Sequence, residues 1–147
     1  MMRQGISAVI VLEGQRVPKF LILHRKLNWV GWELLKGGML ENETELECLR
    51  REIKEETGLS EEEYRVYETP YFYEFKYPKP IPKDGSYYEG ARHHVFVVFT
   101  NKKKIKICDE EHDDYSWVTA QEALEKLTHE NQKEALKYVL NNFFEQS

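Results

Sequence analysis

The sequence predicts one α+β domain, in which a helix lies between two groups of strands along the chain and two further helices follow. Three observations lead to this prediction. The 147 residues, 41% of them hydrophobic, suffice for one core but not comfortably for two. Apolar, strand-like runs occur on both sides of a segment with helical periodicity, and helical patterns fill the C-terminal part. We therefore expect residues 1–147 to form a single domain.

The first two predicted strands form a hairpin. Residues 6–12 read as a largely buried strand that ends at Glu13-Gly14. Residues 19–25 are its expected partner, because Pro18 is tolerated where a strand begins.

An irregular segment is expected to lead into the first helix. Residues 29–38 contain three glycines and two tryptophans, which is typical of irregular backbone. Residues 44–57 contain neither Gly nor Pro, and Leu46, Leu49 and Ile53 recur at helical spacing. The pattern predicts a helix with one apolar stripe.

Strands return after this helix. Residues 64–77 are aromatic and β-rich, with an interruption at Pro70. Residues 77–90 are rich in Pro and Gly, so we expect a long loop, and such loops often form lids or binding surfaces. Residues 94–100 give the strongest strand signal, and residues 115–118 predict a short strand.

Two helices are expected at the C-terminal end. Thr119 can cap a helix that continues to about Leu127, because Glu122 stands at the spacing of a capping box. The last helix is expected over residues 131–144.

The first helix carries three glutamates on one face. At about 100° per residue, Glu52, Glu55 and Glu56 fall in a narrow arc beside the apolar stripe. Their mutual repulsion costs roughly a few tenths of a kcal/mol per pair, so a compensating charge is expected. Mg²⁺ or Mn²⁺ prefers carboxylate and water oxygens and is often held by a few carboxylates plus substrate phosphates. This face is therefore a predicted site for a divalent cation and a phosphate anhydride.

Glycines and an arginine frame the acidic face. Gly37 and Gly38 allow a tight loop before the helix and close approach of a phosphate. Gly58 follows the last helical turn, where a left-handed C-cap is usually Gly. Arg51 adjoins the glutamates, and its guanidinium can orient a carboxylate through two hydrogen bonds.

Together these residues resemble the signature of the Nudix hydrolases. The match begins at Gly37, includes Glu43, and ends with the run Arg51-Glu52-Ile53-Lys54-Glu55-Glu56-Thr57-Gly58-Leu59. The chain departs from the family at Leu35-Lys36-Gly37, where Pro-Lys-Gly is common. This departure concerns the rigidity of the loop rather than the metal site.

The resemblance implies a metal-dependent pyrophosphohydrolase with the Nudix fold, a mixed β-sheet sandwiched between α-helices. It implies that Glu52, Glu55 and Glu56 are the metal ligands, with Arg51 and Glu43 in supporting roles. The implied cofactor is Mg²⁺ or Mn²⁺.

A second resemblance concerns Glu111, which lies six residues before Trp117. Asymmetric diadenosine tetraphosphate hydrolases are similar in this segment. That similarity makes Glu111 a candidate for an additional metal ligand or for the general base. The five histidines show no spacing typical of a zinc site and are expected to be structural.

Substrate contacts are expected outside the metal helix, because aromatic rings stack bases and basic side chains bind phosphates. Tyr88 and Arg92 are the preferred pair in the predicted loop and its continuation. The other candidates lie near the glycine loop and at a strand end: Lys36, Gly37, Gly38 and Arg25.

Composition limits the partners and the compartment. Lys and Arg number 21 against 26 Asp and Glu, and the resulting net charge of −5 argues against indiscriminate binding of long nucleic acids. A small nucleotide remains a suitable substrate, because a metal and local basic residues supply the attraction. No apolar stretch approaches the roughly 20 residues of a membrane span, so we expect a cytoplasmic protein. Both a monomer and a homodimer fit the sequence.

The first hypothesis for the function is hydrolysis of a dinucleoside polyphosphate such as diadenosine tetraphosphate into two mononucleotides. The alternative is removal of pyrophosphate from the 5′ end of RNA, because such Nudix enzymes are similar in the same Glu-to-Trp segment. The acidic net charge favours the smaller substrate. Nucleoside triphosphate or ADP-ribose pyrophosphatase activity comes third. A non-catalytic nucleotide-binding Nudix domain would be indicated by a missing metal carboxylate, and none is missing.

Overall fold

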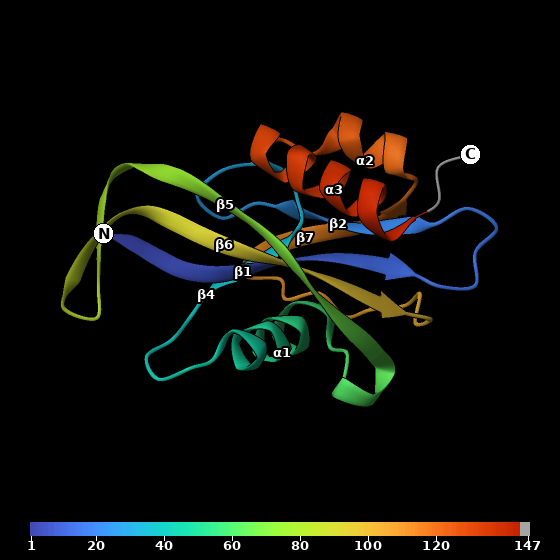
Figure 1. Ribbon diagram of the computed structural model, residues 1–147, viewed down its shortest axis with the longest axis horizontal. Coiled ribbons are helices and arrows are strands. Elements are labelled where there is room, and N and C mark those ends of the chain that lie inside the picture. Colours follow the sequence, from blue (N-terminus) through green and yellow to red (C-terminus); the bar gives the residue numbers. More distant parts are fainter. Residues whose placement is uncertain (145–147) are drawn as a thin grey trace.

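A computed structural model describes residues 1–144 of the chain, which form a mixed β-sheet between helices (Figure 1). Helix α1 covers one face of the sheet, and α2 and α3 cover the other. This arrangement confirms the predicted fold class. The elements in chain order are β1 (Met2–Leu12), β2 (Lys19–Arg25), β3 (Gly31–Glu33), β4 (Leu35–Gly38), α1 (Glu45–Thr57), η1 (Glu61–Glu63), β5 (Tyr64–Lys83), β6 (Ser86–Thr100), β7 (His112–Val118), α2 (Ala120–Lys126) and α3 (Glu130–Phe143).

The sheet has seven strands in the order β3-β2-β1-β6-β5, with β4 paired to β1 and β7 paired to β2. β1 and β6 run parallel, whereas the other pairs are antiparallel. Because helices cover both faces of the parallel pair, residues 5–12 of β1 are buried without alternation. The predicted β1–β2 hairpin is confirmed by the pairing of Val11 with Phe20.

Two apolar cores lie on opposite faces of the sheet. Leu49 and Ile53 of α1 pack in the same core as Phe96 of β6. The neighbouring residue Val97 points the other way, as strand geometry requires, and packs in the core that contains Leu136 of α3. The central strands therefore hold α1 at a fixed position against the sheet.

Helix α1 begins and ends where its capping residues stand. The Thr44 hydroxyl accepts a hydrogen bond from the Glu47 amide, and the Glu47 carboxylate accepts one from the Thr44 amide. At the other end, Gly58 has φ of 76°, and its amide donates to the Lys54 carbonyl. The predicted left-handed C-cap is confirmed.

The predicted apolar stripe of α1 is wrong at its first member. Leu46 is 45% exposed, whereas Cys48, Leu49 and Ile53 are fully buried. The angular position of Leu46 fits the stripe, but it lies in the first turn, beside the exposed loop that precedes the helix.

The expectation of irregular backbone over residues 29–38 is also wrong, because two short strands form there. Glu33 of β3 pairs with Leu23, and Lys36 of β4 pairs with Ser7. The free edges of β1 and β2 supply hydrogen-bond partners that the local sequence does not reveal.

The long loop predicted over residues 77–90 is instead the end of the β5–β6 hairpin. Its turn is Asp84-Gly85, with φ of 51° and 78°, and Lys83 pairs with Ser86 across it. Asp-Gly is a favoured two-residue hairpin turn. Proline is tolerated in β5 because this strand lies at the sheet edge, and the pairing is irregular between Lys76 and Ile81.

The C-terminal half otherwise follows the prediction. β7 extends the expected short strand at its N-terminal side, and α2 begins at the predicted Thr119–Glu122 capping box. α3 begins and ends one residue before the expected bounds. Within the described residues, no helix combines the length and the apolar character that a membrane span requires.

The guanidinium of Arg51 connects α1 to the loop before it. Nε and Nη2 donate to the two Glu43 carboxylate oxygens at 2.7 and 3.0 Å, and Nη2 also donates to the Gly38 carbonyl at 3.0 Å. Nη1 donates to Glu52 at 2.8 Å. The hydrogen bonds from Arg51 lower the pKa of Glu43 to about 2, so this carboxylate stays charged.

A small polar cluster interrupts the core on the face opposite α1. The Ser7 hydroxyl lies 2.5 Å from the Tyr73 hydroxyl and 3.1 Å from Nδ1 of His93. His93 is 3% exposed. Its burial, together with the charges of Lys36 and Arg3, lowers its pKa to about 3.

We expect Arg51→Lys to lower the free energy of unfolding by about 2 kcal/mol, because an ammonium group cannot replace the paired hydrogen bonds to Glu43. Urea denaturation measures this change. Arg50→Lys is the matched control, since its guanidinium binds Glu61 at a more exposed position. Equal losses in the two variants would contradict the special role of Arg51.

The neutral state of His93 predicts an acid-dependent loss of stability. As pH falls below about 6.5, the unfolded chain binds a proton at this residue, whereas the folded chain does not until about pH 3. The stabilisation is therefore present above the unfolded pKa and is lost as pH falls. Between about pH 7 and pH 5, the parent should lose about 2 kcal/mol more unfolding free energy than His93→Gln. A parental slope in His93→Gln would contradict the prediction.

Candidate functional site

Three glutamates of α1 meet where the helix faces the sheet. Glu52 and Glu56 are buried and Glu55 is half-exposed, with one oxygen of each within 4.8 Å of the others. Burial raises the pKa of Glu52 to about 7, and the charges of Glu55 and Glu56 add to the rise, while Arg51 opposes it. A cation bound at this face would relieve the repulsion.

The glycine loop packs directly against this face. A Cβ atom at Gly37 would lie 2.2 Å from the carboxyl carbon of Glu52, and one at Gly38 would lie 2.2 Å from the guanidinium carbon of Arg3. No larger residue fits at either position without displacing these side chains. The two glycines therefore bring the backbone, a carboxylate and a guanidinium together.

Glu111 lies beside the α1 glutamates, although it precedes β7 in the sequence. Glu56, Glu111 and His112 each offer one atom that could bind a metal, and these three atoms lie within 4.8 Å of one another. Glu56 thus belongs to both acidic groups. The Glu111 side chain is 39% exposed, and its carboxylate lies 3.8 Å from Nη1 of Arg25.

His112 connects two buried carboxylates. Its Nε2 donates a hydrogen bond to Glu33 at 2.7 Å. Its Nδ1 lies 2.6 Å from a carboxylate oxygen of Glu56, so the two groups form an ion pair, although the angles are not those of a hydrogen bond. Burial alone would lower the pKa of His112, but the two carboxylates outweigh it and raise the pKa to about 9. The histidine is therefore positively charged at neutral pH.

Two predicted phosphate-binding residues converge on the same buried acid. Nη1 of Arg25 donates to Glu33 at 3.1 Å, and Nζ of Lys36 lies 3.8 Å from it. Burial opposes ionisation of Glu33, but His112, Lys36 and Arg25 hold its pKa below the ordinary value. Both basic side chains thus stand beside the acidic face.

The donor set fits a hard divalent cation. Glu52, Glu55 and Glu56 of α1 all offer carboxylate oxygens, the ligands that Mg²⁺ and Mn²⁺ prefer. Within residues 1–144, the Glu56 oxygen that faces His112 makes no hydrogen bond. This oxygen already has the charged His112 ring as its ion-pair partner, so the fit to a cation rests on the convergent carboxylate oxygens of Glu52, Glu55 and Glu56.

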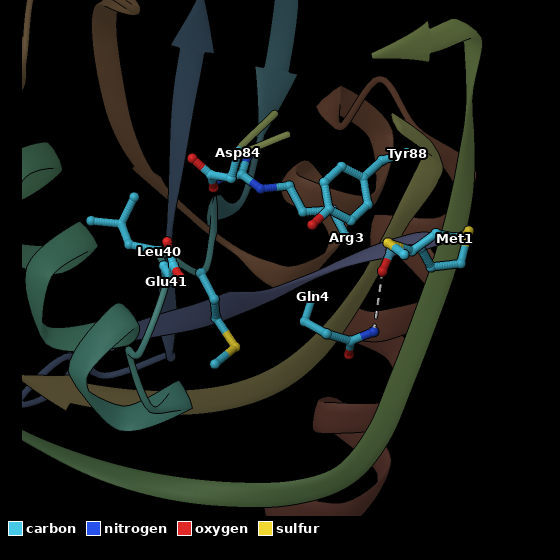
Figure 2. Close-up of a pocket in the computed structure, with 9 residues that line it drawn as sticks. Met1, Arg3, Gln4, Leu40, Glu41, Asp84 and Tyr88 are labelled. Carbon is cyan, nitrogen blue, oxygen red and sulfur yellow. Dashed lines mark hydrogen bonds between the residues drawn. The ribbon is translucent and has the colours of Figure 1, made fainter. Parts of the chain in front are cut away.

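Two hollows lie next to the glycine loop. The smaller, about 100 Å³, is lined by Arg3, Lys36, Gly37, Gly38, Phe75, Tyr77, Ala91 and His93. The larger, about 380 Å³, is lined by Met1, Met2, Arg3, Gln4, Met39, Leu40, Glu41, Asp84 and Tyr88. Figure 2 shows Arg3 and Tyr88 on one side of the larger hollow and Leu40 and Glu41 on the other. Arg3 lines both hollows.

Arg92, like Arg25, is a substrate-binding candidate that lines neither hollow. Its guanidinium lies 3.9 Å from the centre of the Phe72 ring, and Nε lies 3.6 Å from Glu74. A substrate contact by Arg92 stays a prediction from the sequence.

Sequence reasoning missed Glu33, His112, Arg3 and His93. Glu33 did carry a signal, because it is a lone acid among Trp32, Leu34 and Leu35, and a buried charge requires a partner. The histidines carried no such signal, since spacing along the chain does not reveal contacts between distant strands.

Comparison with known proteins identifies relatives over most of the chain. An RNA pyrophosphohydrolase of Bartonella henselae is 32% identical over 122 residues, which cover 76% of this chain and 69% of that protein. The mRNA-decapping protein g5R of African swine fever virus is 37% identical over 68 residues, 46% of this chain and only 23% of that longer protein.

Solved structures share the fold. The dihydroneopterin triphosphate pyrophosphohydrolase of E. coli has a TM-score of 0.77 at 20% identity and covers 97% of this chain and 99% of its own. A C. elegans Ap4A hydrolase binary complex has a TM-score of 0.73 at 15% identity, and the match covers 97% of this chain and 98% of that chain. The family model for the NUDIX domain matches residues 1–139. The chain therefore belongs to the Nudix family.

Proposed function

We propose that this Nudix pyrophosphohydrolase cleaves dinucleoside polyphosphates such as diadenosine tetraphosphate, giving two mononucleotide products. The single observation that carries the choice of substrate is the pair of hollows that share Arg3 beside the glycine loop. The smaller is lined by Phe75 and Tyr77 and the larger by Tyr88, rings on which a base can stack, and a dinucleoside substrate has two bases.

The acidic face is the proposed site of phosphate chemistry. We assign Glu52, Glu55 and Glu56 as ligands of Mg²⁺ or Mn²⁺, because their oxygens converge on the side of α1 next to Gly37. A divalent cation there supplies charge against phosphate oxygens and makes water a stronger nucleophile. Glu111 is the proposed fourth ligand or the general base, since it lies beside Glu56 and is open to solvent.

Basic residues complete the proposed binding of the phosphate chain. Arg3 and Lys36 line the smaller hollow at the glycine loop, and Arg25 pairs with Glu33 and lies 3.8 Å from Glu111. Their charges favour a substrate that carries several phosphates, although the whole chain is acidic. Arg51 positions the loop and Glu52 through its hydrogen bonds.

Removal of pyrophosphate from the 5′ end of RNA is the second candidate. It is favoured by the relatives named RNA pyrophosphohydrolase, including that of Bartonella henselae. The two hollows would then hold the first two nucleotides of the strand. A pterin triphosphate, which is named for the E. coli structure, has one ring system and would occupy one hollow.

Glu55→Gln should lower kcat by roughly 10²-fold, because the loss of one ligand charge removes several kcal/mol of metal stabilisation. The change should also weaken Mn²⁺ binding, measured by electron paramagnetic resonance. Glu55 is half-exposed, so folding should be preserved. Glu134→Gln, a surface change in α3, is the control. Parental turnover of Glu55→Gln at limiting metal would remove Glu55 from the metal site.

The substrate is tested by comparing kcat/KM for diadenosine tetraphosphate, triphosphorylated RNA, dihydroneopterin triphosphate, ATP and ADP-ribose. We expect diadenosine tetraphosphate to lead the panel. Tyr88→Ala should lower its kcat/KM by about tenfold or more relative to that of ATP, because one base loses its stacking partner. Tyr87→Ala is the control, since this adjacent side chain is 70% exposed and points to the other face.

A tenfold preference for triphosphorylated RNA, about 1.4 kcal/mol of discrimination, would replace the first candidate by the second. A corresponding preference for dihydroneopterin triphosphate would reject both. Equal losses from Tyr88→Ala and Tyr87→Ala would reject the larger hollow as a base site.

A further inference from the structure

The His93 ring is held rigidly in the wall of the smaller hollow. Its position on β6 pairs with Gly5 of β1, where a Cβ atom would lie 2.8 to 2.9 Å from the Cδ2–Nε2 edge of the ring. Tyr73 and Phe75 pack edge-on against the ring, with centroids 5.5 and 5.2 Å away. The ring therefore lies against the Gly5 backbone and between two aromatic side chains.

The contacts of Nδ1 determine which ring nitrogen carries the proton. The Ser7 and Tyr73 hydroxyls lie 2.5 Å apart, and they lie 3.1 Å and 3.4 Å, respectively, from Nδ1 of His93. The two hydroxyls supply one hydrogen each to these three contacts. If Tyr73 donates to Ser7 and Ser7 donates to Nδ1, both hydroxyl hydrogens have an acceptor. If Nδ1 carried the proton, one hydroxyl hydrogen would have no acceptor within this buried cluster, which is costly.

The neutral ring therefore carries its proton on Nε2. The low pKa of His93, caused first by burial and then by Lys36 and Arg3, excludes a second proton at neutral pH. Among the residues that the structure describes, Nε2 has no hydrogen-bond partner, and it is not one of the fully enclosed atoms. His93 lines the smaller hollow, so Nε2–H is the ring donor that remains for a ligand there.

We propose that His93 is a specificity-determining residue, whose Nε2–H donates to an acceptor atom on the edge of a base in the smaller hollow. Ser7 and Tyr73 are positioning residues that fix the tautomer. The rings of Phe75 and Tyr77 and the cations of Arg3 and Lys36 complete the lining, so the ligand is a flat heterocycle attached to phosphates. This inference rests on the proposed nucleotide substrate.

The tautomer is tested without a substrate. Long-range ¹H–¹⁵N spectra of the ¹⁵N-labelled protein should show His93 protonated on Nε2 and unprotonated on Nδ1. The double change Ser7→Ala with Tyr73→Phe removes both donors and should shift the proton toward Nδ1. A proton on Nδ1 in the parent would overturn the proposal.

Recognition is tested with the same resonances and two probes. AMP should shift the His93 Nε2–H signal, whereas ribose 5-phosphate, which has no base, should not. Equal shifts with both probes, or none with either, would overturn the proposal. This readout needs no turnover, so it separates failure of the inference from failure of the proposed reaction, which the kcat/KM panel measures.

Variants give a kinetic measure of the same contact. His93→Leu should lower kcat/KM for diadenosine tetraphosphate by about tenfold relative to inorganic tripolyphosphate, the base-free comparison. His93→Gln retains an N–H donor and should recover most of this loss. Equal effects of His93→Leu on both substrates would show a structural role and reject the assignment.

Discussion

Compensation of buried negative charge is the constraint on which the rest of the site depends. Glu33, Glu52 and Glu56 are each at most 9% exposed, and a buried carboxylate without a partner is very costly. Arg51 pairs with Glu52, while His112 lies between Glu33 and Glu56. The cationic partners come from both the helix and the strands, so the acidic face can exist only when α1 is docked on the sheet. The proposed cation balances the charge that remains.

Features set by neighbouring residues were predictable from the sequence. The extent of α1 follows from its local pattern and the cap at Gly58, and the convergence of Glu52, Glu55 and Glu56 follows from helical periodicity. These relations need no knowledge of the sheet. The position of Glu111 beside this group was predicted only through a family resemblance, because no local rule joins the start of β7 to α1.

Contacts across the sheet were not predictable. Glu33 and His112 meet because β3 and β7 both pair with β2, where Leu23 lies opposite Glu33 and Arg25 lies opposite His112. A shift of one residue in either register would turn one partner to the other face. The β5–β6 hairpin was missed for another reason: its prolines suggested a loop, although Asp84-Gly85 is a strong turn signal.

The same prolines protect the outer edge of the sheet from other chains. Lys83 and Ser86 close the two-residue turn, so Pro82 and Tyr87 form the next, non-hydrogen-bonded pair, in which backbone groups point outward. Pro78 and Pro80 lie in the segment where the pairing of β5 with β6 is irregular, and each removes a further backbone N–H donor from this stretch of the edge strand. An edge that lacks successive N–H donors cannot template a further strand. The long hairpin can thus extend away from the core without inviting edge-to-edge aggregation.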